Sequence, residues 1–128
     1  AAQTLVLLSR LPVESGGASA QARVLAVKVE IEETFYDDWD LDRAAGRAGL
    51  SRRRFTELFR QNTGDTFGVF LSELRLEHAA KLLRAGDHSV TGVMFASGFN
   101  HVSHFYRRFR QKFGQPPRSW SAEIAKND

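Results

Sequence analysis

The chain contains one short phrase twice. FRQNTG at residues 59–64 returns as FRQKFG at residues 109–114, and a further phenylalanine precedes each copy at the same distance, Phe55 and Phe105. Self-similarity at a fixed separation indicates a structural unit that is built more than once. Any fold for this chain must therefore contain two versions of one local arrangement.

Apolar spacing and capping residues predict helices along the whole chain, and no segment shows sustained strand alternation. The predicted helices span residues 21–36, 41–48, 52–63, 66–85, 90–97, 101–113 and 116–126, the last opened by Pro116 and Pro117. Their expected N-caps are Asp40, Ser51, Asp65 or Thr66, Ser89 and Asn100, with Gly49, Gly64 and Gly86 as stops. In 66–85 the inward side chains are expected to be Phe70, Leu71, Leu74, Ala79, Leu82 and Leu83. The fold class is therefore all-α, with about seven helices.

Each copy of the phrase ends a helix that follows a short helix and a glycine. The order is Ala45, Gly49, Phe55 in the first copy and Met94, Gly98, Phe105 in the second. A short helix, a tight turn and a crossing second helix form a helix-turn-helix unit, whose second helix enters the DNA major groove. Gly49 permits a positive φ in the turn, while Phe55 and Leu58 anchor the second helix to the core. The pattern thus predicts two such units.

Charge is distributed unevenly along the chain. Residues 1–42 carry three basic and eight acidic side chains, whereas residues 43–128 carry fifteen basic and seven acidic ones. Two arginine-rich clusters, residues 52–60 and 107–112, fall inside the repeat. This asymmetry points to a polyanionic partner, although an arginine-rich solvated surface would give the same totals. The placement of the clusters on the repeated helices favours the partner.

The sequence argues against an enzyme, a metal site, a cofactor and a membrane span. It has no cysteine, no Gly-rich phosphate loop and no recognisable Ser, His and Asp set. His101 and His104 could share a metal, but no third ligand is evident. No apolar run approaches the ~18 residues that span a bilayer, and the lack of cysteine fits a reducing, cytoplasmic location. A module that binds an acidic protein surface would explain the charge, but not the duplicated glycine and phenylalanine spacing.

Three motifs follow one another: LDRAAGRAGLSRRRFTELFRQNTG, the connecting LSELRLEHAAKLLRAG, and GFNHVSHFYRRFRQKFGQPPRSW. From about residue 21 to residue 120 the chain resembles the DNA-binding domain of the AraC/XylS family of bacterial transcription regulators. The resemblance implies helix-turn-helix subdomains at 41–63 and 90–113, a long connecting helix at 66–85 and a final helix at 116–126. It also implies sequence-specific binding of double-stranded DNA in successive major-groove segments, with transcription activation as the expected outcome. Met94 departs from the alanine usual in the family.

The resemblance assigns base-facing positions on both recognition helices. They fall on Arg53, Thr56 and Glu57 in the first helix and on Val102, Ser103, His104 and Arg107 in the second. Arginine can bind guanine, threonine can contact a thymine methyl group, and glutamate can accept a hydrogen bond from cytosine. Two alternatives stay open: Glu57 as an i,i+3 salt-bridge partner of Arg54 or Arg60, and His104 as a half-buried packing residue.

Phosphate contacts are predicted at Ser51, Arg52, Arg60, Asn100, Arg108, Arg110 and Lys112. Long cations and helix N-termini are suited to the DNA backbone rather than to bases, and the alternative is an ordinary solvated face. The acidic run from Glu30 to Asp42 holds seven carboxylates and no basic residue, so it should lie away from DNA. It is interpreted as a solvated helix end, with a contact to RNA polymerase or to an upstream domain as the alternative.

Residues 14–20, which are small, polar and Gly-rich, predict a flexible linker ahead of a DNA-binding domain at 21–128. The preceding residues 1–13 include an apolar stretch, Leu5–Leu8, without the basic start of a signal peptide. Family members commonly carry an upstream sensing or dimerisation domain, so residues 1–13 are interpreted as its truncated end. A cloning or processing end is the alternative.

Overall fold

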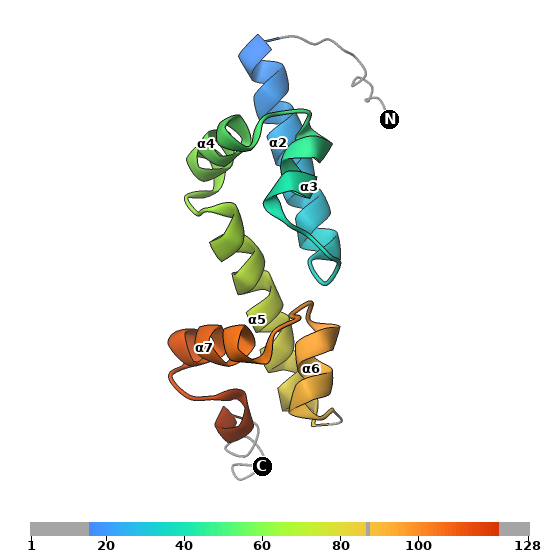
Figure 1. The fold of residues 1–128 in the computed structure, drawn as a ribbon, viewed down its shortest axis with the longest axis vertical. Helices are drawn as coiled ribbons and strands as arrows, with labels where there is room; N and C mark the ends of the chain where they lie inside the picture. Colours follow the sequence, from blue (N-terminus) through green and yellow to red (C-terminus); the bar gives the residue numbers. More distant parts are fainter. Residues whose placement is uncertain (1–15, 87, 121–128) are drawn as a thin grey trace. The chain divides into compact units, whose positions relative to one another are not determined.

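The structure, a computed structural model, describes residues 16–86 and 88–120. Every regular element in this part is a helix, as predicted: α2 (Gly16–Thr34), α3 (Leu41–Ala48), α4 (Arg52–Thr63), α5 (Phe67–Ala85), α6 (Val90–Ala96) and α7 (Val102–Phe113) (Figure 1). Residues 117–120 are also helical, and the rest of the predicted final helix lies outside the described residues. None of the helices described is long and apolar enough to cross a membrane.

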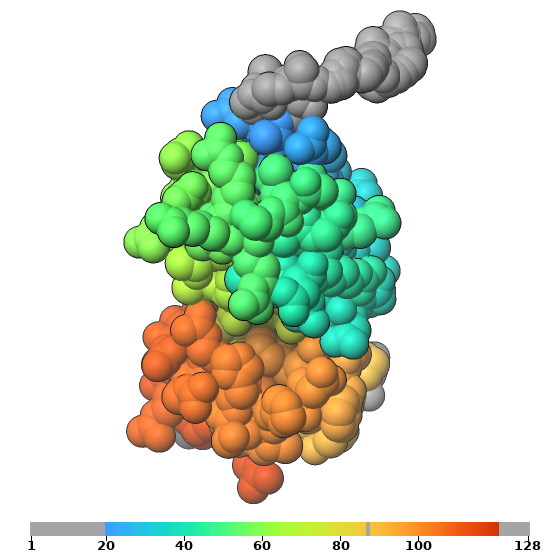
Figure 2. Space-filling model, turned by 45° about the horizontal axis from the view of Figure 1, so that its top comes forward, coloured from blue at the N-terminus to red at the C-terminus, as the bar shows by residue number. Residues whose placement is uncertain are grey.

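The helices belong to two compact units. Within the described residues, the first unit comprises residues 16–31 and 40–67, and the second comprises residues 32–39 and 68–120 with its gap at 87. The first therefore contains α3, α4 and most of α2, while the second contains α6, α7 and nearly all of the connecting helix α5. Figure 2 shows the atoms of the described residues as space-filling spheres, with α4 in green and α7 in orange.

In the first unit, α3 and α4 begin and end where capping residues predict. The Asp40 carboxylate accepts a hydrogen bond from the Arg43 amide at 2.7 Å, and Ser51 Oγ accepts one from the Arg54 amide at 3.1 Å. Both bonds satisfy amides that have no partner in the first turn of a helix. Gly49 closes α3 with φ +68°, a conformation that a residue with a Cβ rarely adopts. The turn between the two helices is thus specified locally.

The core of the first unit is built from buried side chains of α2, α3 and α4. Val24, Val27 and Ile31 are buried, as predicted for one face of α2. Phe55 and Phe59 from α4 are fully buried, with ring centroids 5.3 Å apart. Because aromatic side chains bury the largest apolar areas, this pair fixes α4 against the unit.

The second unit repeats this arrangement with a longer chain of rings. Phe105 and Phe109 from α7 are fully buried 5.7 Å apart, and the series continues through Phe113 to Trp120, where successive centroids lie 4.5 and 4.8 Å apart. Met94 is 2% exposed within this cluster, so the core accommodates a side chain larger than alanine. Methionine adapts to such a space because it is unbranched and flexible.

The prediction for the inward face of α5 was only partly right. Of the expected set, Leu71, Ala79 and Leu83 are buried, whereas Phe70, Leu74 and Leu82 are only half-buried. Leu76 and Ala80, which the prediction omitted, are buried instead. The helix is rich in leucine on several faces, so spacing alone did not identify the stripe formed by Leu76, Ala79, Ala80 and Leu83.

Several boundaries also differ from those predicted. Helix α2 begins at Gly16, inside the segment interpreted as a flexible linker, because the buried Ala20 already packs in the helix and good helix formers follow it. Glu14, Ser15 and residues 1–13 lie outside the described part. Asn100 is not the N-cap of α7, because the helix starts one residue later than predicted and its N-cap is His101. The His101 side chain makes no cap hydrogen bond. Smaller shifts end α2 at Thr34 and α6 at Ala96 and start α5 at Phe67.

Candidate nucleic-acid interface

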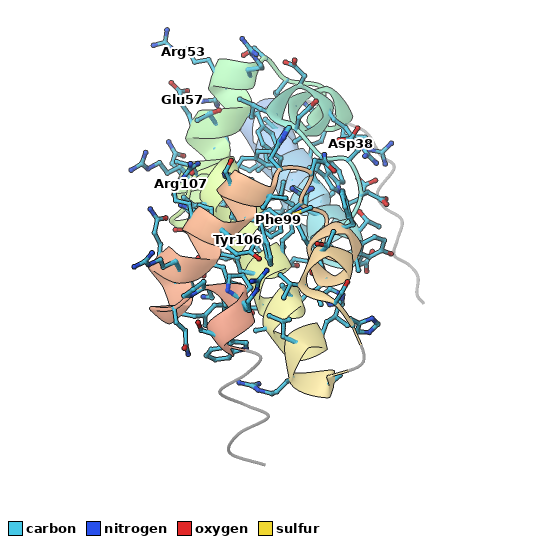
Figure 3. The ribbon with its side chains drawn as sticks, turned by 60° about the horizontal axis from the view of Figure 1, so that its bottom comes forward. Asp38, Arg53, Glu57, Phe99, Tyr106 and Arg107 are labelled. Atoms are coloured by element: carbon cyan, nitrogen blue, oxygen red, sulfur yellow. The ribbon has the colours of Figure 1, made fainter. Side chains whose placement is uncertain are left out.

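The outward face of α4 carries the residues predicted to contact bases in the first unit. The Arg53 side chain is 90% exposed and Glu57 is 47% exposed, and Figure 3 shows both projecting from the helix. Arg53 Nε lies 3.5 Å from a Glu57 carboxylate oxygen, and Arg54 lies 3.8 Å from the other oxygen. Thr56 is half-buried between them and the core face. The salt-bridge alternative for Glu57 is therefore present with Arg54, as an i,i+3 pair.

The predicted phosphate contacts of the first unit lie at both ends of α4. Ser51 Oγ is engaged in capping, and Arg52 forms a 3.4 Å ion pair with Asp42 in α3. Both members of that pair are largely exposed, so the interaction is weak and Arg52 can exchange partners. Arg60 is exposed in the last turn.

In the second unit, α7 exposes a mixed face. Val102 is 56% exposed, and Ser103 and Arg107 are also exposed. His104 is half-buried against Phe99, with ring centroids 5.8 Å apart, and its Nδ1 lies 3.1 Å from an Arg107 guanidinium nitrogen. Burial, followed by the charges of nearby cations, holds the pKa of His104 below its usual value. The packing alternative for His104 thus matches its surroundings.

The predicted phosphate contacts of the second unit differ in how available they are. Asn100 and Arg110 are exposed, and Arg108 donates to the side chain of Gln111 at 3.3 Å. Lys112 forms ion pairs with two carboxylates of α5, a very close one with Glu73 and a 3.8 Å one with Glu77. Because its charge is already compensated within the unit, Lys112 is the least available of these cations.

Sequence patterns gave no sign of the role of Arg75 in the second unit. Its Nε donates to the carbonyl of Phe35 and its Nη2 to the carbonyl of Asp37, both at 2.8 Å. Desolvation lowers the pKa of Arg75, and the nearby Asp38 opposes that shift. Its partners lie about forty residues away in the sequence, beyond the reach of any helical spacing rule.

The acidic segment is more than a solvated helix end. Glu30 forms a two-pronged ion pair with Arg47, with oxygen–nitrogen distances of 3.1 and 2.6 Å, and Asp42 pairs with Arg52. Asp40 caps α3. Among the residues that the structure describes, no three His, Cys, Asp or Glu side chains gather as metal ligands would.

Comparison with known proteins shows to which family this arrangement of helices belongs. Residues 44–123 match the helix-turn-helix domain family. The HTH-type transcriptional activator RhaS of Salmonella schwarzengrund is 35% identical over 116 residues, which cover 91% of this chain but only 42% of that relative. One similar solved structure is the DNA-binding domain of AdpA in complex with a target DNA, with 28% identity and a TM-score of 0.77 over 82% of this chain and 95% of that one. Another is a probable AraC family transcriptional regulator from Rhodopseudomonas palustris, with 27% identity and a TM-score of 0.70 over 80% of this chain and 97% of that one. The chain belongs to the AraC/XylS family of helix-turn-helix DNA-binding domains.

Proposed function

We propose that this chain binds double-stranded DNA with sequence preference, through α4 and α7 as recognition helices in successive major-groove segments. One observation carries the proposal: the helix-turn-helix arrangement occurs twice, and each second helix buries a phenylalanine pair while exposing arginine on the opposite side. A helix anchored in this way presents its polar face to a groove in one orientation. The DNA-bound AdpA domain is a similar structure.

In α4 we assign base contacts to Arg53, Thr56 and Glu57. The exposed Arg53 side chain suits a guanine, to which arginine donates two hydrogen bonds. Glu57 would accept a hydrogen bond from a cytosine while its other carboxylate oxygen pairs with Arg54, so the base contact and the salt bridge are compatible. Ser51, Arg52 and Arg60 would contact phosphates at the two ends of the helix.

In α7 we assign the principal base contact to Arg107, with Val102 and Ser103 near the helix N-terminus. An exposed valine suits the methyl group of thymine, and serine can pair with several bases. Asn100, Arg108 and Arg110 would bind phosphates. Lys112, predicted as a phosphate contact, is assigned instead to bracing α7 against α5 through Glu73 and Glu77.

Regulation of transcription, with activation as the outcome, is the wider role that we propose. The RhaS relative is described as an activator, and this chain spans less than half of its length. An upstream sensing or dimerisation domain, a cytoplasmic location and a contact of the acidic residues with RNA polymerase are parts of the same proposal. Residues 21–128 would form the DNA-binding domain, now with Gly16–Ala20 as the start of α2 rather than a linker.

Selection of bound sequences from random duplexes, followed by footprinting of the chain, tests the proposal. Because the two recognition helices differ in sequence, we expect an asymmetric protected site of ~15 to 20 base pairs across two major grooves about one helical turn apart. Binding should weaken steeply with salt. A palindromic requirement would contradict this reading of α4 and α7. Equal affinity for every duplex, with tighter binding to an acidic protein, would instead favour a protein-interaction module.

A further inference from the structure

We propose that His104 is a positioning residue for Arg107, so that the neutral imidazole sets the base preference of α7 and makes that preference fall with acidification. This inference rests on the proposed function. It replaces the direct base contact predicted for His104 with an indirect role. Its geometric basis is the hydrogen bond that Arg107 donates to His104, whose ring packs against the core.

The hydrogen bond defines the protonation state of His104. An arginine guanidinium has only donors, so the Nδ1 atom 3.1 Å from Arg107 Nη2 must be the acceptor. This hydrogen bond therefore requires a neutral ring with its proton on Nε2. A doubly protonated ring would have no acceptor and would repel the guanidinium.

The ring of His104 has a fixed support. It packs against Phe99, which is 2% exposed within the core cluster and lies 5.0 Å from the fully buried Phe105. Arg107, by contrast, is exposed, and Figure 3 shows it projecting from α7, away from Phe99. Because an exposed arginine has many rotamers, donating a hydrogen bond to a fixed ring reduces the conformational freedom that Arg107 loses on binding a base.

The electrostatic surroundings of His104 oppose its protonation. The charged and titratable groups that act on it are Arg107 and Arg108 from α7, His101 from the preceding turn and Arg75 from α5, and all are basic. Together with burial, which is the larger cause, they lower its pKa. The positioning form therefore predominates at neutral pH and is lost as the pH falls through the lowered value.

The first experiment compares binding to the preferred duplex and to a scrambled one, near neutral pH and at about pH 5. In the wild-type chain, we expect the ratio of the two affinities to fall roughly tenfold on acidification, because Arg107 loses its support. Binding to the scrambled duplex should strengthen at the same time, because a protonated His104 adds a positive charge near phosphates. A general loss of fold would weaken both.

Two variants separate positioning from packing. His104→Asn places the Oδ1 acceptor close to the position of Nδ1, so it should keep the neutral-pH preference within about threefold and lose most of its pH dependence. His104→Leu fills the space without an acceptor, so it should relax selection at one base pair at every pH, as Arg107→Ala does. In an Arg107→Ala background, His104→Leu should have no further effect on preference.

The outcomes distinguish this inference from the proposed function. If His104→Leu kept full base preference, or if His104→Asn lost as much preference as His104→Leu, the positioning role would be wrong while DNA binding stood. An unchanged preference in the wild-type chain at a pH where NMR shows His104 protonated would also overturn it. A chain without any sequence preference would overturn the proposed function, and this inference with it.

Discussion

Each helix-turn-helix unit has a glycine at the equivalent position of its turn, but the two glycines are required for different reasons. Gly49 and Gly98 both have positive φ values, +68° and +101°. A Cβ on Gly49 would meet only Arg23 Nε at 3.8 Å, whereas a Cβ on Gly98 would lie 2.7 Å from Arg75 Nε and 3.0 Å from Tyr36 Cα. The first glycine is required for its conformation alone, and the second for conformation and space.

The recognition helices are also fixed by different means. Helix α4 begins with a serine cap, while α7 begins at His101 without a side-chain cap hydrogen bond. The second unit compensates with packing, because its phenylalanine pair continues into Phe113 and Trp120. The position of a recognition helix can therefore be set by a local hydrogen bond, as in α4, or by tertiary contacts, as in α7.

The largest effect is expected from Phe109→Ala and its counterpart Phe59→Ala, at about 3 to 5 kcal/mol of unfolding free energy each. Both tryptophans, Trp39 and Trp120, belong to the second unit. Tryptophan fluorescence should therefore report the earlier unfolding of the second unit in Phe109→Ala. In Phe59→Ala, the first unit should unfold earlier, so circular dichroism should change before tryptophan fluorescence does. Coincident transitions in Phe59→Ala would show that the two units unfold as one.

The second-largest effects are expected from alanine substitutions at the turn glycines, which should destabilise the two units to different extents. We expect Gly49→Ala to cost about 1 to 2 kcal/mol, from the left-handed backbone alone. Gly98→Ala should cost about 1 to 3 kcal/mol more, because the added methyl group must displace Arg75 or the backbone at Tyr36. Urea unfolding measures both. Equal losses would mean that Arg75 moves aside freely.

A smaller effect should come from the helix caps. Ser51→Ala removes the bond to the Arg54 amide, so it should destabilise the chain by about 0.5 to 2 kcal/mol. His101→Ser supplies the cap that α7 lacks and should stabilise it by up to about 1 kcal/mol. Thermal melts of both variants check this, and a destabilised His101→Ser would show that the start of α7 is set by packing alone.

The smallest effects should distinguish two cations of α7. Arg110→Ala should reduce the slope of the logarithm of the DNA-binding constant against the logarithm of the salt concentration by about one unit, as expected for a lost phosphate contact. Lys112→Ala should leave that slope unchanged and lower stability by no more than about 1 kcal/mol, because its ion pairs with Glu73 and Glu77 are near the surface. A reduced slope in Lys112→Ala would restore it to the phosphate contacts.

The sequence predicted what depends on neighbours along the chain. The caps at Asp40, Ser51 and Ser89 and the buried phenylalanine pairs follow from local rules, and all are present. The omissions depend on partners far away: Lys112 with Glu73, and Arg75 with the carbonyl of Phe35. No spacing pattern encodes such contacts. The predicted base and phosphate contacts stay predictions, since the family resemblance supplies their positions but not the DNA.

The fit of Gly98 against Arg75 and Tyr36 has a consequence for how such domains can be recombined. Residues 32–39, which comprise the last residues of α2 and the loop after it, belong to the second unit, and Arg75 of α5 donates hydrogen bonds to the carbonyls of Phe35 and Asp37 in this segment. A chimaera joined at Gly86, between the two copies of the repeat, would bring a foreign turn against this arginine. Exchange of DNA specificity between two such domains should therefore succeed when residues 32–39 and α5 are transferred together with α6 and α7. The residues that would have to be exchanged together are therefore discontinuous in the sequence, although the repeated phrase is not.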